Sequence, residues 1–267
     1  MRTALLEARD ISKSFGAVKA VDGVSLSLAV GEIGSVIGPN GAGKTTLFNA
    51  LSGFSPVDRG TVTLDGRDIT RKPPHRIARL GLVRTFQTAR PLGNATVLEN
   101  VLAGSYLHAK GGVWSSLFPL GAVRRAEREL VLRCHATLAT VGLADESERY
   151  PGELTAGQLR LLEIARGLAA KPRVLLLDEP AAGLNQVETA RLERTLRDIR
   201  DQGTTLLLVE HDVDLVLRVS DRVTVLDFGR LLCHGAPAEI RRDPAVAAAY
   251  FGTRDAGVTA RNEGAIS

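Results

Sequence analysis

A glycine-rich segment carries the clearest chemical signal in the sequence. Residues 38–45 read Gly-Pro-Asn-Gly-Ala-Gly-Lys-Thr, which fits G-x-x-x-x-G-K-[ST], and they lie between an expected strand at 33–37 and an expected helix at 43–51. Glycines let successive backbone amides point inward around a phosphate, and the helix that follows adds its positive end. We therefore expect Lys44 to neutralise the β- and γ-phosphates of a nucleotide and the Thr45 hydroxyl to ligate Mg²⁺.

A phosphate-binding loop alone is compatible with kinases, GTPases and motor ATPases, and a second segment narrows this range. The apolar run at 174–177 ends in Asp178, and Glu179 follows it. Open α/β sheets bind ligands at the carboxyl ends of their strands. This places Asp178 to hold a metal ion and Glu179 to polarise a water molecule against the γ-phosphate. In isolation such an Asp-Glu pair could be an ordinary helix start, but beside the phosphate loop it favours catalysis.

Two single residues are candidates because of their positions. His211 follows the apolar run at 206–209, so its side chain is expected at the same sheet edge. A lone histidine is as often structural. Gln87 ends the run Arg84-Thr85-Phe86-Gln87, where strand-rich sequence gives way to helical sequence. A lone glutamine usually has no catalytic role, and only its place at this junction makes Gln87 a candidate.

A second anion site is expected at Leu154-Thr155-Ala156-Gly157-Gln158, which leads into an expected helix at 157–170. Small residues at a helix start leave backbone amides exposed at the positive end of the helix dipole. The chain already has a complete phosphate loop. A second anion site therefore makes sense if it caps a nucleotide that is held by another copy.

The elements that must position these residues are expected to form one α/β core interrupted by a helical insert. Short strands are expected from residue 5 to about 69, with a hairpin turn at Asp65-Gly66. One long helix at 123–141, ended by Gly142, dominates the region from 87 to 152. Strands and helices then alternate, which indicates a mainly parallel sheet. The later elements are expected at 173–177, 186–201, 204–209 and 212–219, followed by a hairpin at 223–233.

The composition excludes several classes of protein. The 267 residues carry 34 Lys+Arg against 30 Asp+Glu, a net charge of +4, which does not suit a protein that coats a polyanion. A hydrophobic content of 44% indicates a globular chain. The longest apolar runs are strand-sized, so neither a membrane-spanning helix nor a secretory signal is expected. We expect a soluble chain in the cytoplasm.

Together these motifs resemble the ATP-binding subunit of an ABC transporter, over about residues 5–235 and in the family's order. The resemblance implies an α/β P-loop NTPase core with a mainly parallel sheet, an N-terminal antiparallel β part and an inserted helical subdomain. It implies a single ABC ATPase domain at 1–251, with its core at about 1–88 and 158–251 and its helical subdomain at about 89–157. Residues 252–267 are expected to form a flexible tail.

The resemblance also implies a role for each motif residue. Phe15 resembles the aromatic residue that stacks on adenine, and Gln87 the residue that senses Mg²⁺ and the permease. Asp178 resembles the Walker B metal ligand, Glu179 the catalytic glutamate and His211 the switch histidine. The metal set is thus Thr45, Gln87 and Asp178. The remaining nucleotide-binding residues are Gly38, Pro39, Asn40, Gly41, Ala42, Gly43, Lys44, Thr45 and Thr46 of the Walker A loop, and Leu154, Thr155, Ala156, Gly157 and Gln158 of the signature, which acts in trans on the partner's ATP.

The sequence departs from the family pattern in three places. The signature reads Leu-Thr-Ala-Gly-Gln rather than L-S-G-G-Q, so Thr155 keeps the hydroxyl and Ala156 replaces a glycine. The adenine residue is Phe15 rather than tyrosine. The usual S-A-L-D of the D-loop ends in Asn185, which carries no charge, and the electrostatic coupling between the two ATP sites is expected to differ.

Several segments are similar to the ATPases of high-affinity branched-chain amino acid importers, namely 84–87, 104–120, 179–185, 209–212 and 249–252. The resemblance implies an ATPase that dimerises head to tail, with an identical copy or a paralogue, around two Mg-ATP molecules. It would drive integral-membrane permease subunits from the cytoplasmic face of the inner membrane, as a peripheral subunit that is soluble when isolated, and would work indirectly with a solute-binding protein. No nucleic acid partner is expected.

Other functions remain open on the sequence. They are a urea or amide importer, a lipid or lipopolysaccharide exporter, and a regulatory ABC protein without transport. Soluble ABC proteins of translation or DNA repair usually carry two cassettes or a long coiled coil, and this sequence shows neither. The insert at 104–120, with Trp114 and Phe118, is expected to dock a permease together with Gln87. The alternative is that these aromatics pin the insert to the helical subdomain.

Overall fold

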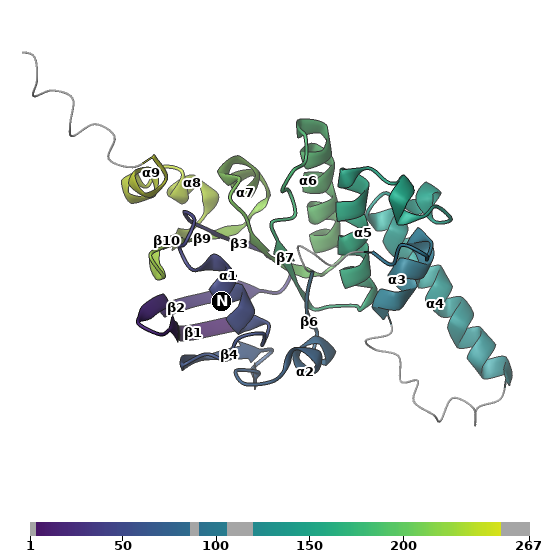
Figure 1. Ribbon diagram of the computed structural model, residues 1–267, viewed down its shortest axis with the longest axis horizontal. Coiled ribbons are helices and arrows are strands. Elements are labelled where there is room, and N and C mark those ends of the chain that lie inside the picture. The colour runs from purple at the N-terminus through teal and green to yellow at the C-terminus, as the bar shows by residue number, and fades with distance from the viewer. Residues whose placement is uncertain (1–3, 86–90, 106–119, 252–267) are drawn as a thin grey trace, which may run out of the picture.

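The computed structural model describes residues 4–85, 91–105 and 120–251. It contains two β-sheets (Figure 1). The first sheet is antiparallel and has the order β2-β1-β4-β5. Its strands are β1 (Ala4–Phe15), β2 (Val18–Ala29), β4 (Arg59–Leu64) and β5 (Arg67–Asp68). The short strands expected in this part of the sequence are confirmed for β4 and β5, which have 6 and 2 residues. The expectation was wrong for β1 and β2, which have 12 residues each. The hairpin turn expected at Asp65-Gly66 is confirmed, with φ of 52° and 71°.

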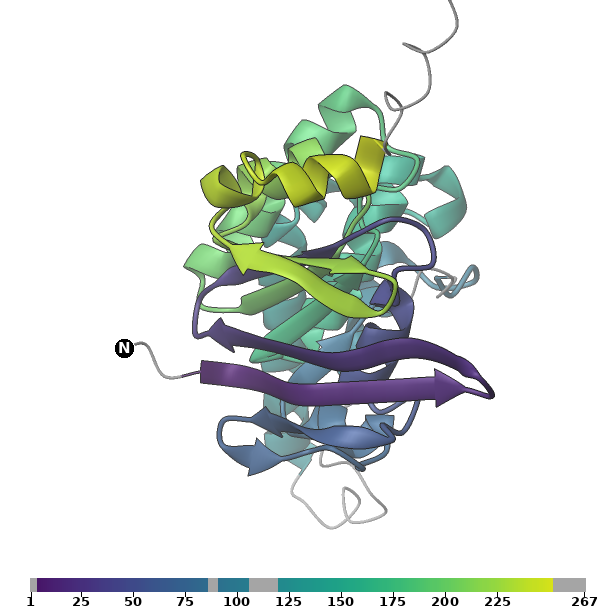
Figure 2. The ribbon, with the colours of Figure 1, turned by 90° about the vertical axis from the view of Figure 1, so that its left-hand side faces the viewer.

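The second sheet is mainly parallel and has the order β10-β9-β3-β8-β7-β6. Its strands are β3 (Ile33–Ile37), β6 (Leu82–Arg84), β7 (Val174–Asp178), β8 (Thr205–Val209), β9 (Arg222–Asp227) and β10 (Arg230–Gly235). Only the β9–β10 pair is antiparallel. Every residue of β3, β7 and β8 is buried, which explains why they read as nearly continuous apolar runs. Figure 2 shows the long β1 and β2 strands beneath the β9–β10 hairpin.

Helices pack against the two sheets and alternate with their strands along the chain. They are α1 (Lys44–Leu51), α2 (Pro74–Arg79), α5 (Ala156–Ala169), α6 (Gln186–Asp201), α7 (Val213–Val219), α8 (Pro237–Ile240) and α9 (Pro244–Phe251). The helix α1 packs into the core between the two sheets, where Leu47, Phe48 and Leu51 are fully buried in one cluster with residues of β1, β2 and β3. Asn185 and Asp212 cap α6 and α7 by accepting hydrogen bonds from backbone amides three residues on.

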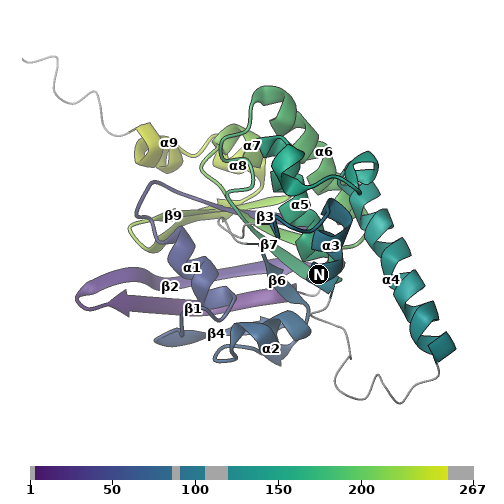
Figure 3. The same cartoon turned by 45° about the vertical axis from the view of Figure 1, so that its right-hand side comes forward.

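A helical part lies beside the sheet frame (Figure 3). It contains α3 (Val97–Ser105), α4 (Leu120–Thr140) and the 3₁₀ turns η3 (Ala144–Glu146) and η4 (Pro151–Glu153). Val101, Leu138 and Leu161 share one buried cluster, which joins α3 and α4 to α5. The long helix expected at 123–141 is confirmed as α4, and Gly142 follows it with φ of 70°. No helix among the described residues is both long and apolar enough to span a bilayer.

Candidate active site

Three neighbouring parallel strands end at one edge of the second sheet and place the candidate residues there. Val36 of β3 pairs with Val209 of β8, and Val209 pairs with Asp178 of β7. The Glu179 amide donates to the Val209 carbonyl at 2.8 Å, and the Glu210 amide donates to the Val36 carbonyl at 3.3 Å. The structure therefore brings the loop that follows β3, the Asp178-Glu179 pair and the segment containing His211 to the same edge, as expected.

The loop between β3 and α1 depends on its glycines. Gly38, Gly41 and Gly43 have φ of 155°, 82° and 96°, in a region that other residues rarely adopt. A Cβ atom at Gly43 would lie 2.2 Å from the Ala20 carbonyl oxygen, so the backbone runs too close to β2 for a side chain. Of the other expected loop residues, Asn40 is exposed, Pro39 is half-buried and Ala42 is buried.

Lys44 folds back onto this loop. Its Nζ donates to the carbonyl oxygens of Gly38 at 2.6 Å and Pro39 at 3.0 Å, and the residue is only 7% exposed. Burial lowers the pKa of Lys44, while the charge of Glu179 acts in the opposite direction. Thr45, which is exposed, and Thr46, which is half-buried, follow in the first turn of α1. The loop thus holds a buried positive charge where anionic phosphate groups are expected.

Replacing Gly43 by alanine should disturb this loop more than the left-handed backbone angle alone would, because the added Cβ would also clash with Ala20. Gly43 and Gly203 both have φ of 96°, but a Cβ at Gly203 would meet nothing within 4 Å. Left-handed backbone costs a non-glycine residue about 1–2 kcal/mol. Gly203→Ala should lower the free energy of unfolding by that amount, and Gly43→Ala should lower it further and weaken nucleotide binding. Urea denaturation and titration with a fluorescent ATP analogue measure both. Equal stability of the two variants with unchanged nucleotide affinity would contradict this reading.

Glu179 has a strained backbone. Its φ of 46° lies in the left-handed region, which non-glycine residues enter mainly where the surrounding structure forces them. The forcing contacts are backbone hydrogen bonds from the Glu179 amide to Val209, at 2.8 Å, and from the Ala182 amide to the Glu179 carbonyl, at 3.1 Å. Such strain is frequent at functional sites. The turn fixes the point at which the half-buried Glu179 side chain leaves β7.

The oxygen donors at this edge fit a magnesium ion. Asp178 is 7% exposed, and Thr45 contributes a hydroxyl at the start of α1. Mg²⁺ usually takes one or two protein carboxylates and completes its coordination with phosphates and water. The described residues contain no cluster of three or more His, Cys, Asp or Glu that could hold a metal by itself. Gln87, the third expected metal residue, lies outside the described residues.

A buried carboxylate that the sequence analysis did not single out connects two parts of the site. Glu210 is fully buried; its Oε1 accepts from the Ala181 amide at 2.8 Å and its Oε2 from the His211 amide at 3.2 Å. Burial raises the pKa of Glu210, and these amide hydrogen bonds oppose the shift. Glu210 thereby ties the chain after Glu179 to His211, whose side chain is 58% exposed and whose Nδ1 lies 3.8 Å from Glu210 Oε2. The position of Glu210 directly after the buried strand β8 is the signal in the sequence that could have identified it.

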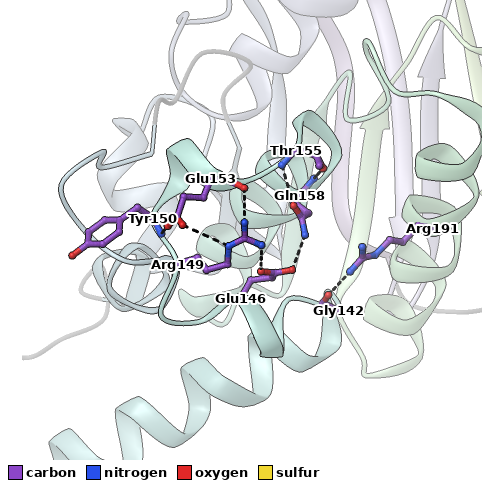
Figure 4. A network of polar contacts seen from close by, with 8 residues as sticks. All are labelled: Gly142, Glu146, Arg149, Tyr150, Glu153, Thr155, Gln158 and Arg191. Carbon is purple, nitrogen blue, oxygen red and sulfur yellow. Dashed lines mark hydrogen bonds and ion pairs between the residues drawn. The ribbon is translucent and has the colours of Figure 1, made fainter.

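The segment 154–158 forms the start of α5, in a polar network with the helical part (Figure 4). Thr155 Oγ1 accepts from the Gln158 amide at 3.2 Å, and Gln158 Oε1 accepts from the Thr155 amide at 2.9 Å, which is a capping box. Gln158 Nε2 also donates to Glu146 Oε1 at 2.9 Å, and Arg149 pairs with the same carboxylate at 2.8 Å. Leu154 is buried and Ala156 is exposed. The network fixes the N-terminus of α5 against η3 and η4.

Gly157 links this segment to α6. Its amide donates to Glu188 Oε1 at 3.2 Å, and a Cβ atom on Gly157 would lie 2.6 Å from the same oxygen. Glu188 belongs to the first turn of α6, which Asn185 caps. The hydrogen-bond partners described for 154–158 therefore lie in the helical part, in α5 and in α6. The structure does not join this segment to the loop 38–45 of its own chain through any described hydrogen bond.

Phe15 lies at the end of β1 as an exposed aromatic side chain. It is 55% exposed, and Lys13 Nζ lies 5.6 Å from its ring centroid. An exposed ring of this kind can stack on a flat aromatic group such as a nucleotide base. The stacking role that the sequence resemblance implies for Phe15 stays a prediction.

With this geometry established, comparison with known proteins identifies the family. The model of the family "ABC transporter" matches residues 21–182, and that of "Branched-chain amino acid ATP-binding cassette transporter" matches residues 230–256. The chain belongs to the ABC transporter family. It is an ATP-binding subunit with ATPase activity, and its function as part of a transporter requires a membrane permease.

Individual relatives cover nearly the whole chain. The high-affinity branched-chain amino acid transport ATP-binding protein LivG of Salmonella typhimurium is 44% identical, over 94% of this chain and 99% of that protein. BraF of Pseudomonas aeruginosa, with the same description, is 43% identical over the same shares. A crystal structure of an ABC transporter ATP-binding cassette in its ADP conformation has a TM-score of 0.82 and 35% identity, over 94% of this chain and 99% of the other. The predicted ABC ATPase fold is thus confirmed.

Proposed function

We propose that this protein hydrolyses Mg-ATP to drive the import of branched-chain amino acids through a membrane permease. The observation that carries the proposal is the meeting of the phosphate loop, Asp178-Glu179 and His211 at one sheet edge. The solute class rests on the LivG and BraF relatives, which are described as high-affinity branched-chain amino acid transport ATP-binding proteins. The import direction rests on the resemblance of the sequence to importer ATPases. The family match at 230–256 supports the same solute class.

In this proposal the chain's own groups carry out most of the chemistry. The backbone N–H groups of Gly38 and of residues 40–43 and the Lys44 ammonium bind the β- and γ-phosphates, and Phe15 stacks on the adenine. Thr45 and Asp178, with Gln87, would hold Mg²⁺, which neutralises phosphate charge when it is bound. Glu179 accepts a hydrogen bond from the attacking water and polarises it.

The buried Glu210 carboxylate holds His211 beside Asp178 and Glu179 at the sheet edge. In this proposal His211 contacts the γ-phosphate. Because Glu210 also binds the Ala181 amide, the position of His211 is coupled to the chain that follows Glu179.

The second ATP contact comes from another ATPase subunit in a head-to-tail dimer, either an identical copy or a paralogue. Thr155 Oγ1 accepts one intrahelical hydrogen bond, so its hydroxyl proton can be donated to the partner's γ-phosphate. The N-terminus of α5 adds backbone amides and the positive end of its dipole. The segment 154–158 would thus act on the nucleotide bound by the partner.

We further propose that residues 1–251 form a single ABC ATPase domain with a helical subdomain at about 89–157. The protein would bind its permease at the cytoplasmic face of the inner membrane and work indirectly with a solute-binding protein. The residues expected to dock the permease, Gln87, Trp114 and Phe118, lie outside the described residues, and so does the expected tail at 252–267.

Reconstitution tests the proposed solute. The chain is purified with its permease, placed in proteoliposomes with the solute-binding protein, and phosphate release is measured with leucine, isoleucine, valine or urea. We expect the three branched-chain amino acids to stimulate hydrolysis and to accumulate on the side opposite to the binding protein. Stimulation by urea alone, or export, would replace the proposed function by one of its alternatives.

A further inference from the structure

Arg84 is a buried cation at the metal side of the proposed site. It is the last residue of β6, which pairs with β7 so that Arg84 lies opposite Leu176, two residues before Asp178. Its Nη2 donates to Asp178 Oδ2 at 2.6 Å, and both side chains are only 7% exposed. This ion pair joins residues 94 positions apart in the sequence.

The other arm of the guanidinium reaches α1, the helix that begins with Lys44 and Thr45. Arg84 Nη1 donates to Asn49 Oδ1 at 2.6 Å and to Ser52 Oγ at 3.3 Å. The guanidinium carbon also lies 5.7 Å from the Phe48 ring centroid and 5.8 Å from that of Phe54, within the range of cation–π attraction. One side chain therefore connects the ends of β6 and β7 with the helix that follows the phosphate loop.

We propose that Arg84 is a positioning residue that holds Asp178 in the orientation needed to bind magnesium. This inference rests on the proposed function of Asp178 as a metal ligand. The Arg84 hydrogen bond engages Oδ2, and the lone pairs of Oδ1 would be directed to the ion. Because the same guanidinium is anchored to Asn49 and Ser52, it fixes the carboxylate relative to α1 and hence relative to Thr45.

The chemistry of the site explains why an arginine suits this position. A carboxylate as buried as Asp178 is costly without a partner charge, and removing one member of a buried pair leaves the other uncompensated. The planar guanidinium donates in two directions at once, whereas a lysine ammonium is a single point charge on a flexible stem. Groups that orient a metal ligand typically contribute about 10- to 100-fold to metal affinity.

The test compares nucleotide affinity with and without the metal. The full-length protein is titrated with a fluorescent ATP analogue in Mg²⁺ and in EDTA, and the ratio of the two affinities is the magnesium effect. We expect Arg84→Gln to reduce this ratio by about 10-fold while the affinity in EDTA changes little. Arg173→Gln is the matched control, because Arg173 pairs with Asp65 at 2.5 Å near the surface, with side-chain exposures of 46% and 51%. It should leave the ratio unchanged.

Further variants separate positioning from a purely structural role. A structural role would lower the melting temperature and both affinities together, and would leave the magnesium effect as in the wild type. Arg84→Lys keeps the positive charge but lacks the planar guanidinium that donates in two directions. We therefore expect this variant to fold and to show a partly reduced magnesium effect, even if Arg84→Gln does not fold. A wild-type magnesium effect in either folded variant overturns the proposal.

A double-mutant comparison identifies the route of the effect. If Arg84 acts through Asp178, then Asp178→Asn should lower the magnesium effect and adding Arg84→Gln should lower it no further. An additional independent loss in the double variant would overturn the assignment. Absence of a magnesium effect in the wild-type protein would instead refute the metal-binding part of the proposed function.

Discussion

Replacing Glu179 by glutamine should abolish ATP hydrolysis and leave ATP binding intact. Glutamine keeps the shape of the side chain and one hydrogen-bond acceptor, but it lacks the charge that polarises water. Loss of a general base typically costs about 10²- to 10⁴-fold in rate. Phosphate release measured with saturating ATP and Mg²⁺ should fall by this factor. The position tolerates the change, because the strained φ of 46° at Glu179 is set by backbone hydrogen bonds that glutamine preserves.

The same variant should reveal the proposed dimer. With hydrolysis blocked, two subunits should remain closed around two Mg-ATP molecules, and size-exclusion chromatography with ATP and Mg²⁺ should show a dimer that the wild type does not accumulate. Glu148→Gln is the matched control, because Glu148 is exposed in the turn after η3; it should hydrolyse ATP at the wild-type rate. If Glu179→Gln hydrolyses normally, the base is another residue. If it stays monomeric with ATP bound, the trans role of 154–158 is wrong.

The parts of the fold that were predictable are those in which local sequence and final environment agree. The expected strand at 33–37 and the expected helix at 186–201 match β3 and α6 residue for residue. The first is a fully buried apolar run, and the second is an amphipathic run with an Asn185 cap. The chemistry at the sheet edge followed from the same logic, because parallel strands deliver the residues that follow them to one side.

The parts that were missed depend on contacts between distant segments. The length of β1 and β2 comes from their pairing with each other and of β1 with β4, which extends through polar residues that carry little strand signal. The helix α3 was not expected, although Thr96 and Glu99 form a capping pair just before its apolar face. Arg84 and Asp178 form an ion pair although they lie 94 residues apart in the sequence, and neither local segment predicts that contact.

Lys44→Ala should remove most of the affinity for ATP, because Lys44 supplies a buried cation within the phosphate loop. A hydrogen bond to a charged group contributes about 1.5–3 kcal/mol, so the affinity should fall roughly 10- to 100-fold. Titration with a fluorescent ATP analogue measures this directly. Lys72→Ala is the control, since Lys72 is exposed beside α2, and it should bind as the wild type does.

The position of Lys44 also predicts a change in the protein without nucleotide. Its Nζ satisfies the carbonyls of Gly38 and Pro39, so Lys44→Ala leaves these loop oxygens without that donor and should lower the free energy of unfolding by about 1–3 kcal/mol. Urea denaturation without ATP gives this loss, and the denaturation curve with saturating ATP gives the stabilisation by ligand. The wild type should gain more stability from ATP than the variant, because a ligand stabilises the folded state more strongly the lower its dissociation constant is. Equal gains in the two proteins, together with equal ATP affinity, would show that this lysine serves the loop alone and that another cation neutralises the phosphates.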